Sequence, residues 1–329
     1  MAEPLLEVKN LKVQFPTEDG VVKAVDGTSF SVAPGETLGV VGESFLTVMG
    51  LVTKREARIS GEILFRGQDL LKLPPEDFRE IRGAKISMIF QDPLTALNPV
   101  HRVGNQIAEV FQVHRKVSKK EAFDEAINLL QLVGIPEPAK RARRYPHEFS
   151  GGMRQRAMIA MALALSPDLI IADEPTTALD VTVQAQILDL IDQMKKEFDA
   201  AVILITHDLG VVAEHCDDIM VMYAGRMVEY GEARDIYYGA HHPYTWGLLQ
   251  SIARMDQART ERLRPIKGQP PSLIHVPPGC PFNPRCPYVM DICRTEVPQL
   301  IPADGHHASA CHLPLSEKER IVKEEVLVH

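Results

Sequence analysis

Four short apolar runs along the chain each end abruptly in polar residues. These runs are Thr37–Val41, Ile86–Phe90, Leu169–Ala172 and Ala201–Ile205. Apolar runs of this length, bounded by turn residues and separated by helical stretches, predict buried strands of a parallel sheet. Ligands of an open α/β sheet bind at the carboxyl ends of its strands. One such strand end alone would indicate only the start of a loop, but four together predict a site at one edge of the sheet.

Helical periodicity and strand-like alternation mark other segments. Between Asp92 and Ser150 no strand-like run occurs, and one amphipathic face there is formed by Phe123, Ala126, Ile127 and Leu130. A second helix is predicted after Asp180, with an apolar side formed by Val183, Ile187, Leu190, Ile191 and Met194. Residues 6–32 and 59–65 alternate between apolar and polar side chains, which predicts a small antiparallel sheet.

These elements predict an α/β fold in three parts. Residues 1–92 and 157–240 are expected to form a parallel-sheet core with an antiparallel β subdomain. Residues 93–156 are expected to form a helical subdomain inserted into that core. Beyond about Ala240 the chain becomes rich in Cys, Pro and His, so residues 241–329 are expected to form a C-terminal extension.

Composition and charge narrow the function classes. Of the 329 residues, 45% are hydrophobic and 24% are charged, an ordinary globular balance. The net charge of −8 argues against a nucleic-acid binder, which usually carries a basic excess. No uninterrupted apolar stretch reaches the roughly 18 residues of a membrane span, and the N-terminus lacks the basic start and apolar run of a secretory signal. We therefore expect a cytoplasmic protein that works at a membrane only through partners.

The strand at Leu169–Ala172 delivers two adjacent carboxylates, Asp173 and Glu174, directly before Pro175. Successive residues at a strand end point in different directions, so one carboxylate can hold a Mg²⁺ shell while the other takes a proton from an attacking water. On their own the two could equally be surface acids before a proline. A Ser-Gly-Gly turn at 150–152 offers N–H groups at the start of a predicted helix, where an anion is stabilised. The combination favours a phosphate site.

Several segments resemble motifs of ATP-binding cassette (ABC) ATPases. Phe149–Arg156 is similar to the signature motif, Ile171–Asp180 to the Walker B motif and Ile205–Asp208 to the switch-histidine motif. Met88–Pro99 resembles the Q-loop of the dipeptide and oligopeptide importer branch. The tail resembles the same branch at His242–Thr245 and Pro278–Cys286. The resemblance covers essentially the whole chain and implies an ABC-type nucleotide-binding domain with a RecA-like core.

This resemblance implies a role in ATP binding and hydrolysis for each matching residue. Glu174 would act as general base, and Asp173 would hold the shell of a Mg²⁺ ion. Gln91 would contact that ion and the attacking water, and His207 would contact the γ-phosphate. The other implied nucleotide contacts are Phe15 (stacking on adenine), Gly42, Ser150, Gly151 and Gly152, with Asp180 at the interface between two cassettes. From the residues alone, Phe15 could equally be a core aromatic on a strand.

The resemblance also implies partners. Ser150 and Gly152 would bind the γ-phosphate held by the opposite subunit, so hydrolysis would need a head-to-tail pair with a second, similar ATPase subunit. Two membrane permease subunits and an extracytoplasmic substrate-binding protein would complete the complex, with this chain on the cytoplasmic face of the cell membrane. No nucleic acid is expected. Related importers handle dipeptides, oligopeptides, nickel or some sugars, so the substrate is open, as is the identity of the second subunit.

The phosphate-binding loop departs from the family pattern. The motif G-x-x-x-x-G-K-S/T should follow Val41, but the sequence reads GESFLTVMG over Gly42–Gly50. By comparison with the pattern, about seven residues including the lysine are missing, and Ser44 and Thr47 do not replace them. Two explanations are open. Either the segment is truly deleted, leaving a catalytically impaired cassette that supports a partner's ATP site, or the protein carries a loop that this sequence omits.

Four of the five cysteines lie in the C-terminal extension, whereas Cys216 stands alone. The four are Cys280, Cys286, Cys293 and Cys311. Four thiolates in a Pro-rich region of a cytoplasmic protein suggest metal ligands, and a Cys₄ set suits a [4Fe–4S] cluster, which some members of the importer branch are thought to carry. Structural zinc usually begins with a tighter cysteine pair, but zinc and reduced structural thiols remain alternatives. Three nearby histidines are expected to be solvated rather than ligands: His306, His307 and His312.

Overall fold

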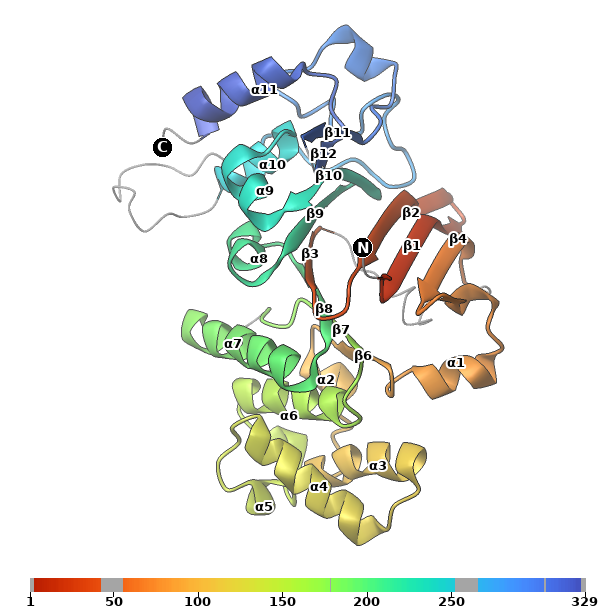
Figure 1. Ribbon diagram of the computed structural model, residues 1–329, viewed down its shortest axis with the longest axis vertical. Helices are drawn as coiled ribbons and strands as arrows, with labels where there is room; N and C mark the ends of the chain where they lie inside the picture. The colour runs from red at the N-terminus through yellow and green to blue at the C-terminus, as the bar shows by residue number, and fades with distance from the viewer. Residues whose placement is uncertain (1–2, 43–55, 178, 252–265, 305, 327–329) are drawn as a thin grey trace. The chain divides into compact units, whose positions relative to one another are not determined.

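A computed structural model describes residues 3–42, 56–177, 179–251, 266–304 and 306–326 (Figure 1). The chain divides into two compact units, and each is described by itself. Unit 1 comprises residues 1–5, 32–36 and 69–205. Unit 2 comprises residues 6–31, 37–68 and 206–329. No helix in the described ranges has both the length and the apolar character that a membrane crossing requires.

Three parallel strands form the sheet of unit 1. They are β6 (Ile86–Ile89), β7 (Leu169–Asp173) and β8 (Ala201–Thr206), with β7 in the middle. Leu169 lies opposite Ile86 on one side and Ala201 on the other. Nearly every residue of the three strands is buried, as expected for parallel strands that are covered on both faces. Three of the four predicted strands are therefore confirmed here.

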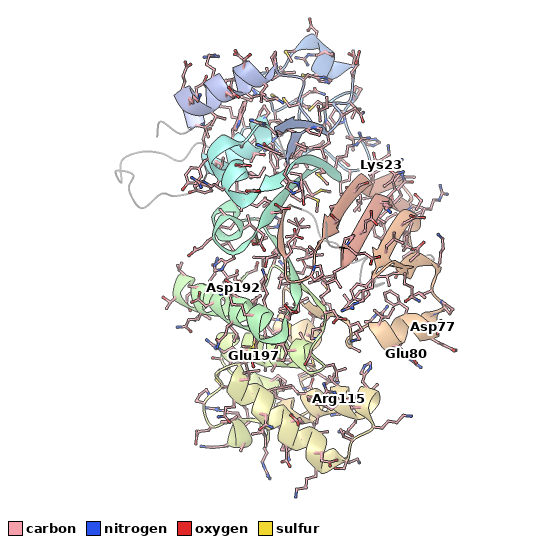
Figure 2. All side chains as sticks on the ribbon, viewed as in Figure 1. Lys23, Asp77, Glu80, Arg115, Asp192 and Glu197 are labelled. Carbon is pink, nitrogen blue, oxygen red and sulfur yellow. The ribbon has the colours of Figure 1, made fainter. Side chains whose placement is uncertain are left out.

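Unit 1 also contains several helices. They are η1 (Leu70–Lys72), α1 (Pro75–Ile81), α2 (Pro93–Ala96), α3 (Val103–Arg115), α4 (Lys119–Leu132), α5 (Pro138–Arg141), η2 (Pro146–Glu148), α6 (Gly151–Leu163) and α7 (Val181–Phe198). Ser118 and Glu121 form a reciprocal capping box at the start of α4, and Ala126 and Leu130 are buried on its inner face. Charged side chains such as Asp77 of α1 and Arg115 of α3 point into solvent (Figure 2). The two predicted helices and the strand-free stretch before Ser150 are confirmed.

Unit 2 contains the predicted antiparallel sheet. Its strand order is β2-β1-β4-β5, with bounds Leu6–Thr17 (β1), Gly20–Val32 (β2), Arg58–Phe65 (β4) and Gln68–Asp69 (β5). Leu6 pairs with Phe65 in antiparallel register, and the register shifts between Lys9 and Lys12. Gly61 lies opposite this irregularity with φ +103°, and a Cβ there would lie 2.5 Å from the carbonyl oxygen of Asn10. Only glycine fits this position.

A second set of strands in unit 2 joins the tail to the core. The order is β11 (Ile301–Asp304), β12 (His307–Ser309), β10 (Arg226–Glu232), β9 (Asp218–Tyr223) and β3 (Thr37–Val41). β3 and β9 are parallel, and the other pairs are antiparallel. The helices of this unit are α8 (Leu209–His215), α9 (Ala233–Gly239), α10 (Pro243–Leu249), η3 (Asp291–Arg294), α11 (Leu315–Ile321) and η4 (Val322–Val326). β12 places residues of the extension directly beside β10, which the sequence pattern does not reveal.

Candidate nucleotide site, cysteine cluster and buried histidines

Glu174, the predicted general base, stands just beyond the end of β7. Its backbone has φ +45°, a left-handed conformation, and its N–H donates to the carbonyl of Ile205 at 2.9 Å. The side chain amide of Gln91 donates to Oε2 of Glu174 at 2.5 Å, and the hydroxyl of Thr177 donates to the same oxygen at 2.9 Å. The structure thus brings together two predicted site residues that are 83 positions apart. Thr177 was not singled out from the sequence, although it lies within the Walker B-like segment.

The signature-like segment begins helix α6. Ser150 is the N-cap, and its Oγ accepts from the N–H of Met153 at 3.3 Å. Ser150 and Gly151 are exposed, and Gly152 is partly buried. The buried side chain of Gln155, one turn further along α6, donates to the carbonyl of Pro175 at 2.6 Å. This bond connects the signature helix to the loop that carries Glu174, because Pro175 directly follows Glu174.

Two more acids of the predicted site lie in unit 1. Asp173 is the last residue of β7 and is partly buried. Asp180 is exposed and caps α7, where its Oδ1 accepts from the N–H of Val183 at 3.0 Å. This cap explains why Asp stands at the position where the helix begins. An exposed N-cap carboxylate is also available to a neighbouring subunit.

Unit 2 carries the other predicted nucleotide contacts. Gly42 follows β3 with φ +125°, and a Cβ there would lie 2.8 Å from the carbonyl oxygen of Met222, so only glycine fits. The segment where the phosphate-loop motif is incomplete, including Ser44 and Thr47, lies outside the described residues. His207 is exposed and directly precedes Asp208, the N-cap of α8. Phe15 is partly buried on β1, which is consistent both with stacking on adenine and with a core aromatic on a strand.

The four cysteines of the extension line one small cavity of unit 2. Cys280 and Cys293 are buried, while Cys286 and Cys311 are partly buried. Burial raises the pKa of Cys280 to about 11 and that of Cys286 to about 12. Both thiols are therefore protonated at neutral pH unless a cation binds them. Gly279 has φ +72°, and a Cβ there would overlap the carbonyl oxygen of Cys293, so the chain can turn this closely only with glycine.

A buried carboxylate, Glu229 of β10, is a feature that the sequence did not indicate. It is 0% exposed and accepts hydrogen bonds from the N–H of His241, the N–H of His242 at 3.2 Å and the hydroxyl of Thr245 at 2.5 Å. Nε2 of His307 lies 2.8 Å from its Oε1.

The histidines of the extension lie in different environments. His307 is 4% exposed, so the expectation that it is solvated is wrong; β12 carries it into the interior beside β10. His306 is exposed, and its Nε2 lies 2.8 Å from Oδ2 of Asp218. His312 is partly buried, and its Nε2 lies 3.0 Å from the carbonyl oxygen of Glu296. Local sequence could not show this because the partners of His306 and His307 lie 88 and 78 positions away.

Comparison with known proteins places these features in one family. Residues 25–177 match the family model described as ABC transporter, and residues 228–293 match the model described as oligopeptide/dipeptide transporter, C-terminal region. The chain is 52% identical over 323 residues to the oligopeptide transport ATP-binding protein OppD of Salmonella typhimurium, covering 96% of each chain. It is 53% identical over 313 residues to the dipeptide transport ATP-binding protein DppD of Bacillus subtilis, covering 92% of this chain and 93% of the relative.

A solved structure supports the fold. The ATP-binding cassette MJ0796 bound to ADP and Pi aligns with a TM-score of 0.61 and 24% identity, covering 70% of this chain and 99% of the other. At this level of identity the likeness concerns the fold, which is that of an ABC nucleotide-binding domain with parallel and antiparallel strands. Taken with the relatives that match almost the full length, these findings show that the chain belongs to the family of ABC transporter ATP-binding proteins.

Proposed function

We propose that this chain is an ATPase subunit that couples ATP hydrolysis to the import of dipeptides or oligopeptides. The observation that carries the proposal is the 2.5 Å hydrogen bond from Gln91 to Glu174. This bond links Glu174, the proposed general base, to Gln91, which lies just before the helical segment 93–156. The named functions of the relatives that match nearly the whole chain, oligopeptide transport and dipeptide transport, give the substrate class.

Each residue of the proposed ATP site has its own role. Glu174 accepts the proton of the attacking water, and Gln91 and Thr177 hold its carboxylate in position. Asp173 would hold a Mg²⁺ ion, which when bound offsets the charge of the phosphates. The remaining contacts proposed for ATP come from Phe15, Gly42 and His207, with Ser150, Gly151, Gly152 and Asp180 serving the nucleotide of a paired subunit.

The proposed complex contains two membrane permease subunits and a second, similar ATPase subunit that pairs head to tail with this chain. An extracytoplasmic protein would deliver the peptide, and this chain would lie on the cytoplasmic face. The exposed N-terminus of α6, with Ser150 and Gly151, is available for such a pairing. The three-part division at residues 92, 156 and 240 remains part of this proposal.

We also propose that the protein carries a complete phosphate loop. The other predicted catalytic positions are present, and Gln91 and Glu174 are in hydrogen-bond contact. Intact-mass spectrometry tests this directly. A mass above 36.6 kDa by about seven small residues is expected. A mass equal to 36.6 kDa would mean that the deletion is real and that ATP is hydrolysed only at a partner's site.

The four cysteines are proposed to hold a [4Fe–4S] cluster. All four line one cavity, yet among the described residues no three of their sulfur atoms lie within 4.8 Å of one another. Four thiolates around one zinc ion, with Zn–S near 2.3 Å, lie about 3.8 Å apart, so the thiols as they stand are not arranged around a single zinc ion. Iron and acid-labile sulfide in the purified protein, both lost in Cys293→Ser, would support the cluster, whereas zinc alone would exclude it.

ATP hydrolysis by the reconstituted complex tests the proposed function. Glu174→Gln should lower the turnover number by about 10²–10⁴-fold, since the general base is lost. Glu197→Gln, a change at an exposed acid of α7, is the matched control and should leave turnover unchanged (Figure 2). Equal turnover of the wild type and Glu174→Gln would contradict the assignment of the base.

A further inference from the structure

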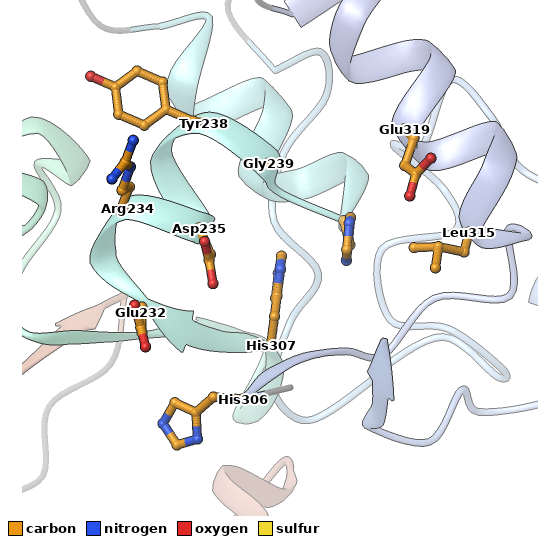
Figure 3. A pocket seen from close by; sticks show the side chains of 10 residues that line it. Glu232, Arg234, Asp235, Tyr238, Gly239, His306, His307, Leu315 and Glu319 are labelled. Carbon is orange, nitrogen blue, oxygen red and sulfur yellow. The ribbon is translucent and has the colours of Figure 1, made fainter. Parts of the chain in front are cut away.

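An open cavity of about 580 Å³ in unit 2 adjoins the buried cluster of Glu229, His241 and His307. His307 of β12, Asp235 of α9 and Glu319 of α11 line this cavity (Figure 3). His241 lines it as well. None of these residues has a part in the ATP chemistry, and none is among the four cysteines, which line a different cavity.

His307 has the surroundings of a metal-binding histidine. Its Nε2 lies 2.8 Å from Oε1 of Glu229, which already accepts bonds from His241, His242 and Thr245. A carboxylate that receives these donors accepts from His307 too, so Nε2 carries the proton and Nδ1 is left with its lone pair. Metal-ligating histidines almost always donate their other N–H to a carboxylate in this way, which fixes the tautomer and the ring orientation.

His241 supplies a second nitrogen. It is 8% exposed, and within the described part of the chain its buried Nδ1 has no hydrogen-bond partner. Buried polar atoms are nearly always paired, so an orphaned ring nitrogen beside a cavity points to a ligand. The ring lies parallel to that of His307 with 4.1 Å between ring centroids, and one ligand atom from each of Glu229, His241 and His307 falls within 4.8 Å of the others.

We propose that His241 and His307 bind a divalent transition-metal ion of the zinc class at the wall of this cavity, with Glu229 as the carboxylate that orients His307. Imidazole nitrogens suit zinc, nickel and copper. Because an ion lies in the plane of each imidazole that binds it, the stacked rings do not share an ion as they stand. Glu229 holds the ring of His307, so binding turns the ring of His241 toward the cavity. Three acids also line the cavity and give it negative charge: Glu232, Asp235 and Glu319.

A metal at this point has a structural consequence. His241 directly precedes α10, whose N-cap is His242, and His307 begins β12 of the extension. The ion therefore crosslinks two segments of the extension that are 66 positions apart, one of which is β12, the strand that pairs with β10. The alternative is a hydrogen-bond network without metal, in which the buried Lys318 serves as the counter-charge of Glu229.

Cobalt titration of the metal-free full chain at neutral pH, without nucleotide, tests the proposal. Cobalt bound by cysteine thiolates gives a charge-transfer band, whereas cobalt bound by imidazole and carboxylate shows only d–d bands. We expect about one equivalent of cobalt to bind with d–d bands only. His241→Gln should weaken this binding by about tenfold or more. His306→Gln, a change at the exposed neighbour in the same cavity, is the control and should bind as the wild type does.

Thermal unfolding with and without zinc provides a second measurement. Zinc should raise the unfolding temperature of the wild type and of His306→Gln but not that of His241→Gln. The transition without metal shows whether each variant folds. Among the described residues, Nδ1 of His241 makes no hydrogen bond that the substitution would remove. The proposal is overturned if the wild type takes up no cobalt outside the thiolate site at micromolar concentration, or if His241→Gln binds as tightly as the wild type.

Discussion

Acid should lower the free energy of unfolding of the C-terminal part of the chain, because it protonates His242. This residue is 1% exposed, and burial lowers its pKa from 6.5 to about 4 against the opposing effect of Glu229. Its Nδ1 accepts a hydrogen bond from the N–H of Tyr244 at 3.1 Å and so caps α10. Only the unprotonated nitrogen can accept this bond. The folded state therefore excludes a proton that the unfolded chain binds.

The sign and size of the effect follow from the two pKa values. A histidine whose pKa is lower in the folded state contributes its full stability above the unfolded pKa and loses it as the pH falls toward the folded pKa. With values of 6.5 and about 4, the window lies between these two pH values. The expected loss is about 1 kcal/mol at pH 5.5 and about 2–3 kcal/mol at pH 4.5.

Trp246 makes this loss measurable. It is the only tryptophan of the chain, is 2% exposed on α10, and donates from Nε1 to the carbonyl of Ala240 at 2.7 Å. Urea unfolding followed by tryptophan fluorescence at pH 7.5, 5.5 and 4.5 therefore reports on the segment that His242 caps. A chelator in the buffer keeps divalent metals out of the measurement.

The variant His242→Asn is the matched comparison. Asparagine is a good N-cap and does not titrate, so the variant keeps an acceptor at this position without the proton linkage. The wild type should lose about 2–3 kcal/mol more than the variant between pH 7.5 and pH 4.5. His241, whose pKa burial and the nearby His307 lower to about 4, is present in both proteins, so its effect cancels. Parallel pH curves for the two proteins would show that His242 is not the source of the pH dependence.

Two further substitutions test local geometry. Thr177→Val removes one donor to Glu174, so ATP turnover in the reconstituted complex should fall about tenfold, while Thr177→Ser should restore it; unchanged turnover in the Val variant would dismiss the contact. Gly279→Ala should lower the free energy of unfolding by at least about 1 kcal/mol, because the added Cβ meets the carbonyl of Cys293. Gly268→Ala also places Ala at positive φ, but its nearest neighbour is 3.6 Å away, so urea titration should show a smaller loss; equal losses would contradict the steric argument.

Much of the fold could be predicted because local pattern and tertiary role coincide. The strand at Leu169–Asp173 is an uninterrupted apolar run, and it is buried because parallel strands are covered on both faces. The helix at Lys119–Leu132 has both a periodic apolar face and a capping box. The strand at Asp218–Tyr223 carries a similar apolar run but was not picked out, although it forms a parallel pair with β3.

The candidate site could be predicted only in part. Glu174 and Gln91 were found through motifs, and the structure shows that they are hydrogen bonded. The buried cluster around Glu229 could not be found in the same way. Its acid lies in an ordinary strand, and its histidines come from positions 241 and 307, so their proximity depends on the pairing of β10 with β12.

In the proposed function, ATP hydrolysis by this chain drives peptide uptake. This is tested by ATP-dependent uptake of a labelled peptide into vesicles that contain the permease subunits, the second ATPase subunit, the substrate-binding protein and this chain. Uptake is expected with the wild type and with Glu197→Gln, and it should be lost with Glu174→Gln. Uptake that continues at the wild-type rate with Glu174→Gln, or a wild-type complex that hydrolyses ATP without moving any peptide, would contradict the proposed function.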